Sequence, residues 1–490
     1  MNAQQLKNSI LQEAIEGRLV PQDPNDEPAS VLLDKIRKEK AKLVKEKKIK
    51  ADKNESYIYR SEDGHWMEHF EDKKREEVCI DDDIPFEIPN RWGWTRLNSL
   101  AEIVRGGSPR PAGSPEFYGG DIPFLKVADL TKDDSMYVKT HSATIKEAGL
   151  KKTREVVADT LLLTNSGATL GVPKICTFKT TFNDGIAAFL CLSDNLKPYL
   201  FWFLCAKTEA FRSINQGTAQ PNLNTDIIKE TLLPMPPLEE QKRIVQTIEK
   251  LMPLIKEYGK AQASLEKLNE ELPERLKKSI LQEAIEGRLV PQDPNDEPAS
   301  VLLEKIRKEK VKLVKEGKLK KKDLEELSIS EEEKCFTIPK GWECAKLSFI
   351  TSLLDGEKRD GDYVCLDAKY LRGKSTGEKL SKGKFVQKDD TIILVDGENS
   401  GEVFTVPCDG YMGSTFKQLW VSESIHLPYV LYFIRFHKDI LRNSKKGAAI
   451  PHLNKDIFNN LVVGIPPLAE QKRIVDKIEQ LLHKIDKLTL

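Results

Sequence analysis

The sequence has few of the patterns that bind a metal ion or build a disulfide framework. Its eight cysteines are scattered and include no C-x-x-C pair, and its seven histidines form no cluster with them at ligand spacing. Such a distribution is typical of reduced, buried thiols. We therefore expect no metal, no cofactor and no disulfide.

Long apolar runs are also missing. No stretch of 18 apolar residues occurs, and the polar N-terminal segment lacks the apolar centre of a signal peptide. We expect a cytoplasmic protein that makes no membrane contact.

Catalytic motifs are absent as well. A base-modifying methyltransferase would need a glycine-rich cofactor turn and an Asn/Asp-Pro-Pro-aromatic loop for the flipped base, and neither occurs. The stretch at 167–171 lacks the Gly-Lys-Ser/Thr that completes a phosphate-binding loop. The Asp-Gly-Glu-Lys tetrapeptide at 355–358 is too compact for a nuclease carboxylate set. These absences argue against an enzyme, including a nuclease–methyltransferase fusion.

An excess of either charge is missing too. The chain has 77 Lys and Arg against 77 Asp and Glu, so any basic surface for nucleic acid must be local. Its 490 residues exceed a single ordinary core and predict several domains. The charged fraction of 31% favours long solvated helices.

What the chain does contain is one segment written twice. Residues 9–33 and 279–303 are identical, and the match extends over 6–50 and 276–320 with five substitutions. A repeat at a fixed offset points to a duplicated architecture.

Two further motifs recur in the same order. FEIPNRW at 86–92 returns as FTIPKGW at 336–342, and PPLEEQKRIV at 236–245 returns as PPLAEQKRIV at 466–475. The offset shrinks from 270 to 250 to 230, so the second half has lost residues in two places without losing its order. The chain is therefore a tandem duplication whose middle parts have diverged.

Each copy predicts the same series of elements. A short helix ends near Gly17, a proline-rich turn follows, and a very basic helix begins at Ser30. A polar linker, predicted to be mobile, leads to an α+β module with short apolar runs and Gly-rich turns.

The residues after each PPLxEQKRIV motif show heptad spacing. This pattern predicts two long helices that pack on each other, and the alternative is that each helix packs on its own domain. Pro253 and Pro273 predict kinks or a break. The candidate pairing and partner-docking residues are Ile244, Ile248, Leu251, Ile255, Leu265, Leu272, Leu276, Ile474, Ile478, Leu481, Ile485 and Leu488.

The two ends of the chain nearly complete the pattern. Leu490 corresponds to Lys260 and Met1 to Glu271, so joining the ends would almost close a second full unit. We predict a quasi-circular, pseudo-twofold arrangement in which residues 1–16 lie beside or beyond the end of the helix at 470–490.

These motifs carry a resemblance to a known family. The order F-x-I-P-x-x-W, Gly-rich module, G-x-A-x-P-x-L-N, PPLxEQKRIV, long helix and L-K-x-S-I-L-Q-E-A-I-x-G-R-L resembles the DNA specificity subunit of type I restriction–modification systems. The resemblance covers nearly the whole chain. It implies an α+β fold with two target recognition domains separated by two long antiparallel coiled-coil helices.

The resemblance also implies partners. Each recognition domain would read half of a split sequence in double-stranded DNA, while the helices and repeats would dock two methyltransferase subunits and recruit restriction subunits. The chain would divide into an N-terminal helix and connector (1–50), a linker (51–85), recognition domain one (86–237), a central helix (238–275), a second connector (276–322), a linker (323–335), recognition domain two (336–467) and a C-terminal helix (468–490).

Candidate DNA contacts are Arg, Lys, Asn and Gln in Gly-rich loops, because these side chains suit base edges and phosphates. Each could equally be a solvated loop residue, and Asn224 and Asn454 could cap the helices that follow them. The candidates are Arg105, Ser108, Arg110, Lys126, Asn165, Thr169, Gln220, Asn222, Asn224, Lys369, Arg372, Lys374, Asn399, Lys417, Gln418, His452 and Asn454.

The basic helices at 30–50 and 300–322 are nearly invariant between the copies, which favours partner docking or sequence-independent backbone contact over a merely solvated face. The competing function is a coiled-coil scaffold that binds only proteins. Two separately diverged modules inside matched flanks favour a DNA reader instead.

Overall fold

The structure is a computed structural model in which the chain forms two compact units, Met1–Ser264 and Leu265–Leu490. It describes residues 1–52, 54–72, 75–214, 223–326, 328–330, 333, 337–443 and 452–488. Within these residues, no helix is both long enough and apolar enough to cross a bilayer.

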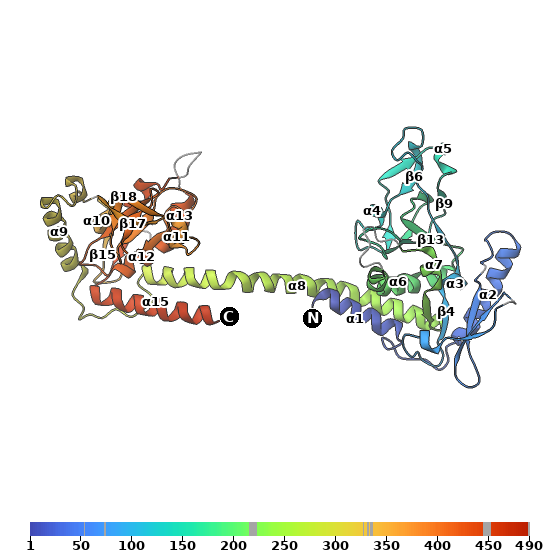
Figure 1. Cartoon of the computed structure of the whole chain (residues 1–490). Coiled ribbons are helices and arrows are strands. Elements are labelled where there is room, and N and C mark those ends of the chain that lie inside the picture. Colours follow the sequence, from blue (N-terminus) through green and yellow to red (C-terminus); the bar gives the residue numbers. More distant parts are fainter. Residues whose placement is uncertain are drawn as a thin grey trace. The chain divides into compact units, whose positions relative to one another are not determined.

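Unit 1 begins with helices, continues into β-rich structure and ends in a long helix (Figure 1). Its helices are α1 (Ala3–Ile15), α2 (Ala29–Lys45), α3 (Leu97–Leu100), α4 (Val127–Leu130), α5 (Glu147–Leu150), α6 (Lys197–Ser213), α7 (Thr225–Glu230) and the start of α8 (Leu238–Ile285). Its strands are β1 (Ser56–Arg60), β2 (Trp66–Phe70), β3 (Val78–Cys79), β4 (Gly93–Arg96), β5 (Glu102–Arg105), β6 (Tyr118–Leu125), β7 (Tyr137–Val138), β8 (Ala143–Ile145), β9 (Arg154–Val156), β10 (Leu161–Thr164), β11 (Pro173–Cys176), β12 (Thr180–Phe182), β13 (Ile186–Leu190) and β14 (Leu232–Met235).

Unit 2 contains the end of α8 and a similar series. Its other helices are α9 (Ala299–Lys315), α10 (Leu347–Ile350), α11 (Ala368–Leu371), α12 (Leu427–Phe436), α13 (Lys438–Asn443), α14 (Lys455–Asn460) and α15 (Leu468–Leu488). Its strands are β15 (Glu343–Lys346), β16 (Thr351–Leu354), β17 (Glu357–Leu366), β18 (Lys379–Val386), β19 (Thr391–Leu394), β20 (Val403–Thr405), β21 (Gly410–Met412), β22 (Phe416–Val421) and β23 (Val462–Ile465).

The two units share part of their strand order. Unit 1 has a β5-β13-β10-β11-β7 sheet, a β8-β6-β12-β9 sheet and a β14-β4 pair. Unit 2 has a β16-β22-β19-β20 sheet, a closed β17-β18-β21 barrel and a β15-β23 pair. Strands β10 and β19 begin 230 positions apart, and α2 and α9 begin 270 apart, so the duplication inferred from the offsets is confirmed at the level of elements.

Short apolar runs form the central strands because alternate side chains serve two cores. Leu161 and Leu163 belong to the cluster around α6, whereas Leu162 belongs to the cluster under β12. In unit 2, Ile393 belongs to one cluster and its neighbour Ile392 to the other. Strands buried on both faces explain why these runs read as continuous apolar stretches.

The recurring motifs converge on one place in each unit. We call these parts the frame: residues 11–45, 88–96 and 232–248 in unit 1, and 281–315, 338–346 and 462–478 in unit 2. In unit 1, Trp92 Nε1 donates to Glu240 Oε2 at 3.0 Å, and Gln22 Nε2 donates to the other oxygen of Glu240 at 2.6 Å. Arg243 pairs with Asp26 at 2.7 Å.

The frame of unit 2 repeats these contacts. Trp342 Nε1 donates to Glu470 Oε2 at 3.0 Å, and Gln292 Nε2 donates to Glu470 Oε1 at 3.2 Å. Arg473 pairs with Asp296 at 2.7 Å. The repeat, F-x-I-P-x-x-W and PPLxEQKRIV motifs therefore recur together because they are the parts of one buried network.

A glycine in each frame has a specific steric role. Gly17 has φ +75° and ends the turn after α1, and a Cβ there would lie 2.5 Å from Pro89 Cγ. Gly287 has φ +72°, and a Cβ there would lie 2.3 Å from Pro339 Cγ. The glycine of the repeat and the proline of F-x-I-P-x-x-W thus fit each other.

Helix α8 differs from the prediction of a break. It is continuous over 48 residues despite Pro253 and Pro273, so the predicted break is wrong. A proline removes the hydrogen bond of its own position only, and the helix continues through both prolines. The helix also continues into the second copy of the repeat, ten residues beyond the predicted end at 275.

The heptad residues serve separate cores. Ile244 and Ile248 are buried in unit 1, and Ile474 and Ile478 in unit 2, so the alternative of packing on the helix's own domain holds for these four. Within unit 1, α1 lies beside α8, and within unit 2, α15 lies beside α8 (Figure 1). Tyr258 on α8 donates to the Met1 carbonyl at 2.7 Å, and Lys277 on α8 pairs with Asp486 on α15 at 3.1 Å.

The remaining heptad residues fall into two groups. Ile255 and Ile485 are buried, and Leu251 and Leu481 are partly buried. Leu265, Leu272 and Leu276 are 57%, 49% and 37% exposed, so no described helix covers them. The side chain of Leu488 lies outside the described part of the chain.

The first linker also differs from the prediction. Residues 51–85 carry a three-stranded sheet, β1-β2-β3, whose Ile58 and Ile80 are buried with Trp94. The prediction of a mobile polar connection is therefore wrong for this segment. The aromatic and β-branched residues of SYIYR and the aromatic residues of WMEHF are a strand signal that the charged flanks obscure.

Candidate nucleic-acid interface

In unit 1, three predicted loop residues converge on one residue, Asp184. Ser108 Oγ donates to Asp184 Oδ1 at 2.6 Å, Arg110 approaches Asp184 Oδ2 at 3.8 Å, and Arg105 Nε donates to the Asp184 carbonyl at 2.5 Å. Asp184 lies in the turn between β12 and β13, far from the loop in sequence. The structure thus joins the Arg105–Arg110 loop to the turn that links the two sheets of the module.

The glycines of this loop permit the close approach. A Cβ at Gly106 would lie 2.2 Å from the Asn183 carbonyl oxygen, and a Cβ at Gly107 would lie 2.3 Å from the Lys152 carbonyl oxygen. Any larger residue would force the loop away from Asp184.

The loop and the turn border a cleft of about 580 Å³. Its polar lining contains donors, Arg110 and Lys126, and acceptors, Asp184 and Asn183. No described residue bonds the buried Oδ1 of Asn183. A base edge presents mixed donors and acceptors, whereas a phosphate presents only acceptors, so this lining suits a base edge better.

Asn183 and Asp184 are functional candidates that the sequence reasoning missed. The Asn-Asp-Gly triplet at 183–185 lies between two apolar strands and is a turn signal that could have found them.

Other predicted residues of unit 1 lie elsewhere. Asn165 is 1% exposed, so its predicted contact with DNA is wrong for this conformation. Thr169 is exposed on the turn beside α6, and Asn224 caps α7 by accepting from the Asp226 amide at 3.3 Å. Gln220 and Asn222 lie outside the described residues.

The predicted residues of unit 2 occupy three places. Lys369, Arg372 and Lys374 lie exposed on and after α11, where Arg372 pairs with Glu402. Lys417 pairs with Asp355, and Gln418 Nε2 donates to Asp390 at 3.1 Å.

The third place is the turn at 396–401 with the residues that follow 451. His452 Nδ1 and Asp396 Oδ1 are 2.6 Å apart, and Asn399 is half-buried in the same turn. Asn454 caps α14, accepting from the Ile457 amide at 3.4 Å, so the alternative of helix caps is confirmed for both asparagines.

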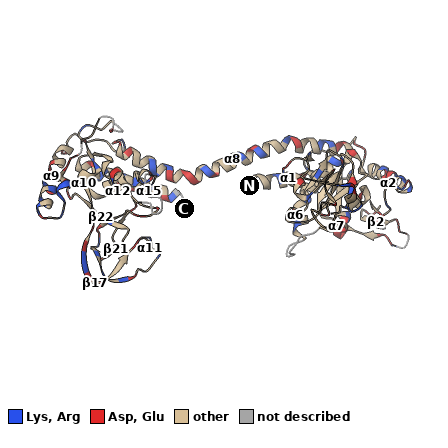
Figure 2. Ribbon diagram, turned by 90° about the horizontal axis from the view of Figure 1, so that it is seen from above, with Lys and Arg blue, Asp and Glu red and all other residues tan. Residues whose placement is uncertain are grey.

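A basic face on the β17–β18 hairpin was not predicted. Lys358 on β17 lies directly opposite Lys384 on β18, and Lys382 lies opposite Asp360 two positions along the same face. Figure 2 shows Lys and Arg along β17. Directly opposed like charges are unfavourable in a sheet unless an anion or a carboxylate compensates them.

The basic face continues to Lys417. Lys384 approaches Asp355 at 3.8 Å, and Lys417 pairs with the same carboxylate. Burial lowers the pKa of Lys417, and the charges of Lys455 and Lys320 lower it further. We name this surface the basic face, made of Lys358, Lys382, Lys384 and Lys417, and its chemistry suits phosphate oxygens.

Aromatic rings support the hairpin from the inside of the barrel. Tyr363, Phe385 and Tyr411 stack edge-on with centroids 4.9 to 6.5 Å apart. A Cβ at Gly383 would lie 2.6 Å from the Tyr411 ring, so the glycine admits this ring. The packing holds the lysines on a rigid element.

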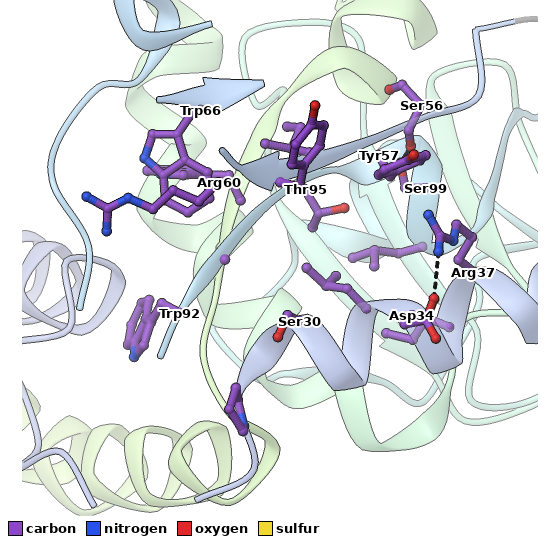
Figure 3. A pocket seen from close by; sticks show the side chains of 18 of the residues that line it. Ser30, Asp34, Arg37, Ser56, Tyr57, Arg60, Trp66, Trp92, Thr95 and Ser99 are labelled. Carbon is purple, nitrogen blue, oxygen red and sulfur yellow. Dashed lines mark hydrogen bonds and ion pairs between the residues drawn. The ribbon is translucent and has the colours of Figure 1, made fainter. Parts of the chain in front are cut away.

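Unit 1 also has a cavity of about 490 Å³ between α2 and the β1-β2-β3 sheet (Figure 3). Arg37 lies over the Tyr57 ring at 4.3 Å and donates to Asp34 at 2.6 Å. Trp66 and Arg60 line the side formed by the sheet. The cavity depends on the sheet that the first linker forms.

Comparison with known proteins agrees with this architecture. A family model described as "Type I restriction modification DNA specificity domain" matches residues 89–267 and 348–489. The chain is 28% identical to the type I restriction enzyme EcoAI specificity subunit of Escherichia coli, across 99% of this chain and 89% of that protein. It is also 28% identical to the EcoEI specificity subunit of the same organism, with the same coverage.

Among solved structures, the HsdS subunit from Thermoanaerobacter tengcongensis aligns with a TM-score of 0.44 and 18% identity, covering 83% of this chain and 93% of that one.

The duplicated frames and their two diverged modules define a two-domain recognition protein. The chain belongs to the type I restriction–modification DNA specificity family. It is a DNA-recognition subunit, and each unit carries one target recognition domain.

Proposed function

We propose that the protein reads a bipartite site in double-stranded DNA, one half-site per unit, and brings methyltransferase and restriction subunits to it. The observation that carries this proposal is the pairing of two equivalent frames with two different polar surfaces. Unit 1 has a cleft of mixed donors and acceptors, and unit 2 has the basic face.

The cleft of unit 1 reads base edges in this scheme. An Arg that bonds a base edge contributes about 1–3 kcal/mol of discrimination. Methylome sequencing of cells that carry Arg110→Ala is expected to show relaxed sequence at one half-site only. The other half-site is the internal control, and an unchanged bipartite sequence would remove Arg110 from the reading surface.

The frames dock the partner subunits. Their buried contacts recur, and their parts at 11–45 and 281–315, which include the basic helices α2 and α9, are nearly identical, as two copies of one partner require. Paired substitutions on matching exposed residues, Lys42→Glu and Lys312→Glu, are expected to weaken methyltransferase binding additively in a pull-down. Retained binding in the double variant would exclude these helices as docking surfaces.

Helix α8 sets the spacing between half-sites. An insertion of four residues, about one helical turn, after Lys267 is expected to lengthen the spacer while both half-sites stay unchanged. Four alanine substitutions at exposed positions of the same segment are the length-neutral control. A contiguous site, or DNA binding that does not respond to salt, would favour the protein scaffold instead.

A further inference from the structure

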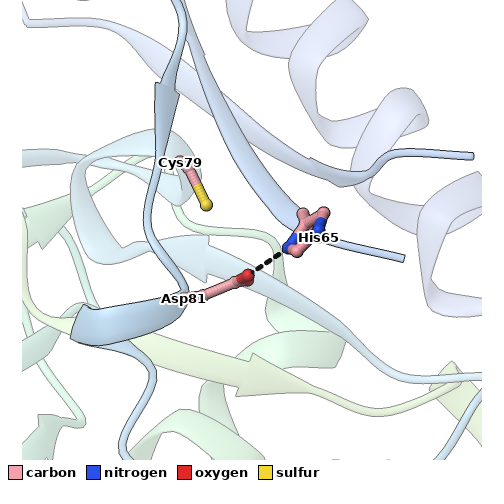
Figure 4. Close-up of side chains that lie close together, drawn as sticks. All are labelled: His65, Cys79 and Asp81. Carbon is pink, nitrogen blue, oxygen red and sulfur yellow. Dashed lines mark hydrogen bonds and ion pairs between the residues drawn. The ribbon is translucent and has the colours of Figure 1, made fainter. Parts of the chain in front are cut away.

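The β1-β2-β3 sheet of unit 1 brings together three side chains that the sequence separates (Figure 4). His65 lies just before β2, Cys79 ends β3, and Asp81 begins the turn that follows. Their ligand atoms all lie within 4.8 Å of one another, and His65 Nδ1 is 2.6 Å from Asp81 Oδ2. All three are exposed and reachable from solvent.

We propose that His65, Cys79 and Asp81 form a zinc-binding site. An imidazole nitrogen, a thiolate sulfur and a carboxylate oxygen are the ligands that Zn²⁺ takes in proteins, at about 2.0–2.3 Å. The thiolate disfavours Mg²⁺ and Ca²⁺, which prefer oxygen ligands. A tetrahedral ion would hold the three atoms roughly 3.5 Å apart, so small side-chain rotations suffice. Water completes the coordination.

Two of the ligands are already oriented by neighbouring backbone groups. The amide of Trp66 donates to Asp81 Oδ1 at 2.7 Å, which leaves Oδ2 directed at the histidine. The turn before β2 fixes the backbone of His65. The His65 amide donates to Ser61 Oγ at 3.1 Å, and the Ser61 amide donates to the His65 carbonyl at 2.9 Å. Such outer contacts are typical of metal sites because they fix the ligand geometry.

The position suits a structural ion. Strand β3 has two residues, both exposed, and pairs with β2 only through Met67–Cys79 and Glu68–Val78. Ile58, Ile80 and Trp94 are the buried residues of the local cluster. A small sheet with so little core gains from a metal clip, and this ion would tie the start of β2 to the end of β3.

The same sheet supplies a matched control. His69 Nδ1 lies 2.7 Å from Glu77 Oε1, which is a second exposed histidine–carboxylate pair between β2 and the segment before β3. The described structure groups no thiol with this pair. His69→Ala therefore removes a histidine from the same sheet without removing a ligand of the proposed site.

The test uses the full chain after chelator treatment. Isothermal titration with Zn²⁺ alone is expected to give one site in the wild type and in His69→Ala. The site is lost in His65→Ala and in Cys79→Ser, and Asp81→Asn weakens it by about tenfold or more. Co²⁺ is expected to show a thiolate charge-transfer absorption that disappears in Cys79→Ser.

The substitutions lie at exposed positions, so the metal-free variants should keep the circular dichroism spectrum of the wild type. Zn²⁺ should raise the Tm of wild type and His69→Ala but not of Cys79→Ser. Equal Zn²⁺ affinity in all five proteins, or no binding by the wild type, would overturn the proposal. DNA recognition is not part of this readout, so the result is independent of the proposed function.

Discussion

The two frames share their buried network but differ around one lysine. Lys40 of α2 is buried, donates to the Asn98 carbonyl and pairs with Glu55 at 2.8 Å. Its counterpart Lys310 of α9 is equally buried, and its hydrogen bonds go to the carbonyls of Ser348 and Phe349 at 3.2 and 3.1 Å. Burial lowers the pKa of Lys310, while Asp323 and Glu326 raise it.

The difference comes from the first linker. Glu55 directly precedes β1, the first strand of the β1-β2-β3 sheet. Unit 1 has this sheet, and the described part of unit 2 lacks it. Duplicated contacts are therefore kept where both partners lie inside the repeats, as with Trp92 and Trp342. Contacts with one partner in the linker, such as Lys40 with Glu55, differ between the units because the linkers differ.

The largest expected effect tests the shared network. Trp92→Ala should destabilise unit 1, and Trp342→Ala unit 2, each by about 3–5 kcal/mol, because both indoles are buried and hydrogen-bonded. Hydrogen exchange of peptides from each unit measures the two separately. The half-buried Trp66→Ala is the control and should cost less. If one unit kept its stability after its tryptophan was replaced, the two frames would not be equivalent.

The glycines test the same equivalence more finely. Gly17→Ala and Gly287→Ala should each cost about 1–3 kcal/mol, because φ is positive and the added Cβ meets a proline. Gly317 has φ +72° with no atom within 4 Å of an added Cβ, so Gly317→Ala isolates the backbone strain and should cost less. Urea unfolding followed by unit-specific hydrogen exchange measures all three. Similar costs for all three would mean that the proline contact is unimportant.

The lysines should separate the frames. Lys40→Met leaves Glu55 unpaired and partly buried, and should cost unit 1 about 1–3 kcal/mol. Lys310→Met removes a buried ammonium that pairs with no carboxylate of the frame. This substitution should change the free energy of unfolding of unit 2 by less than about 1 kcal/mol. The pKa of Lys310 is lowered on folding. Between that lowered pKa and 10.5, the unfolded state therefore binds more protons than the folded state.

The stability of unit 2 should therefore rise as pH increases from the lowered pKa towards 10.5. Lys310→Met should flatten this rise, which hydrogen exchange or chemical unfolding between neutral and alkaline pH can measure. A wild-type unit 2 that lost stability across that window, relative to Lys310→Met, would contradict the assignment.

The smallest effect concerns the basic face. Lys358→Gln and Lys384→Gln should each reduce the slope of log K against log salt for DNA binding by about 0.9, the value for one phosphate contact. Lys379→Gln lies on the other face of β18 and should leave the slope unchanged. Equal slopes in all three variants would remove the hairpin from the DNA interface.

Sequence patterns predicted the repeated elements well because those patterns are local. The shifting offsets placed the starts of α2 and α9 within one residue, although both helices end earlier than predicted, at Lys45 and Lys315. The apolar runs placed β10 and β19 within a residue. Candidate sites fared less evenly. Arg105, Ser108 and Arg110 do share a site, but its fourth residue, Asp184, comes from the turn between β12 and β13. Asn165 is buried inside unit 1.

The sequence by itself determined the duplication, its order, and the residue types that recur in the frames, because identical segments must make similar helices and turns. The tertiary structure alone decided which distant residues meet. Cysteine and histidine spacing predicted no metal site, yet strand pairing brings His65, Cys79 and Asp81 together. The 51–85 segment forms a sheet because Trp94 of β4 packs against its apolar residues Ile58 and Ile80, and a covering surface from elsewhere in the chain is not visible in a local pattern.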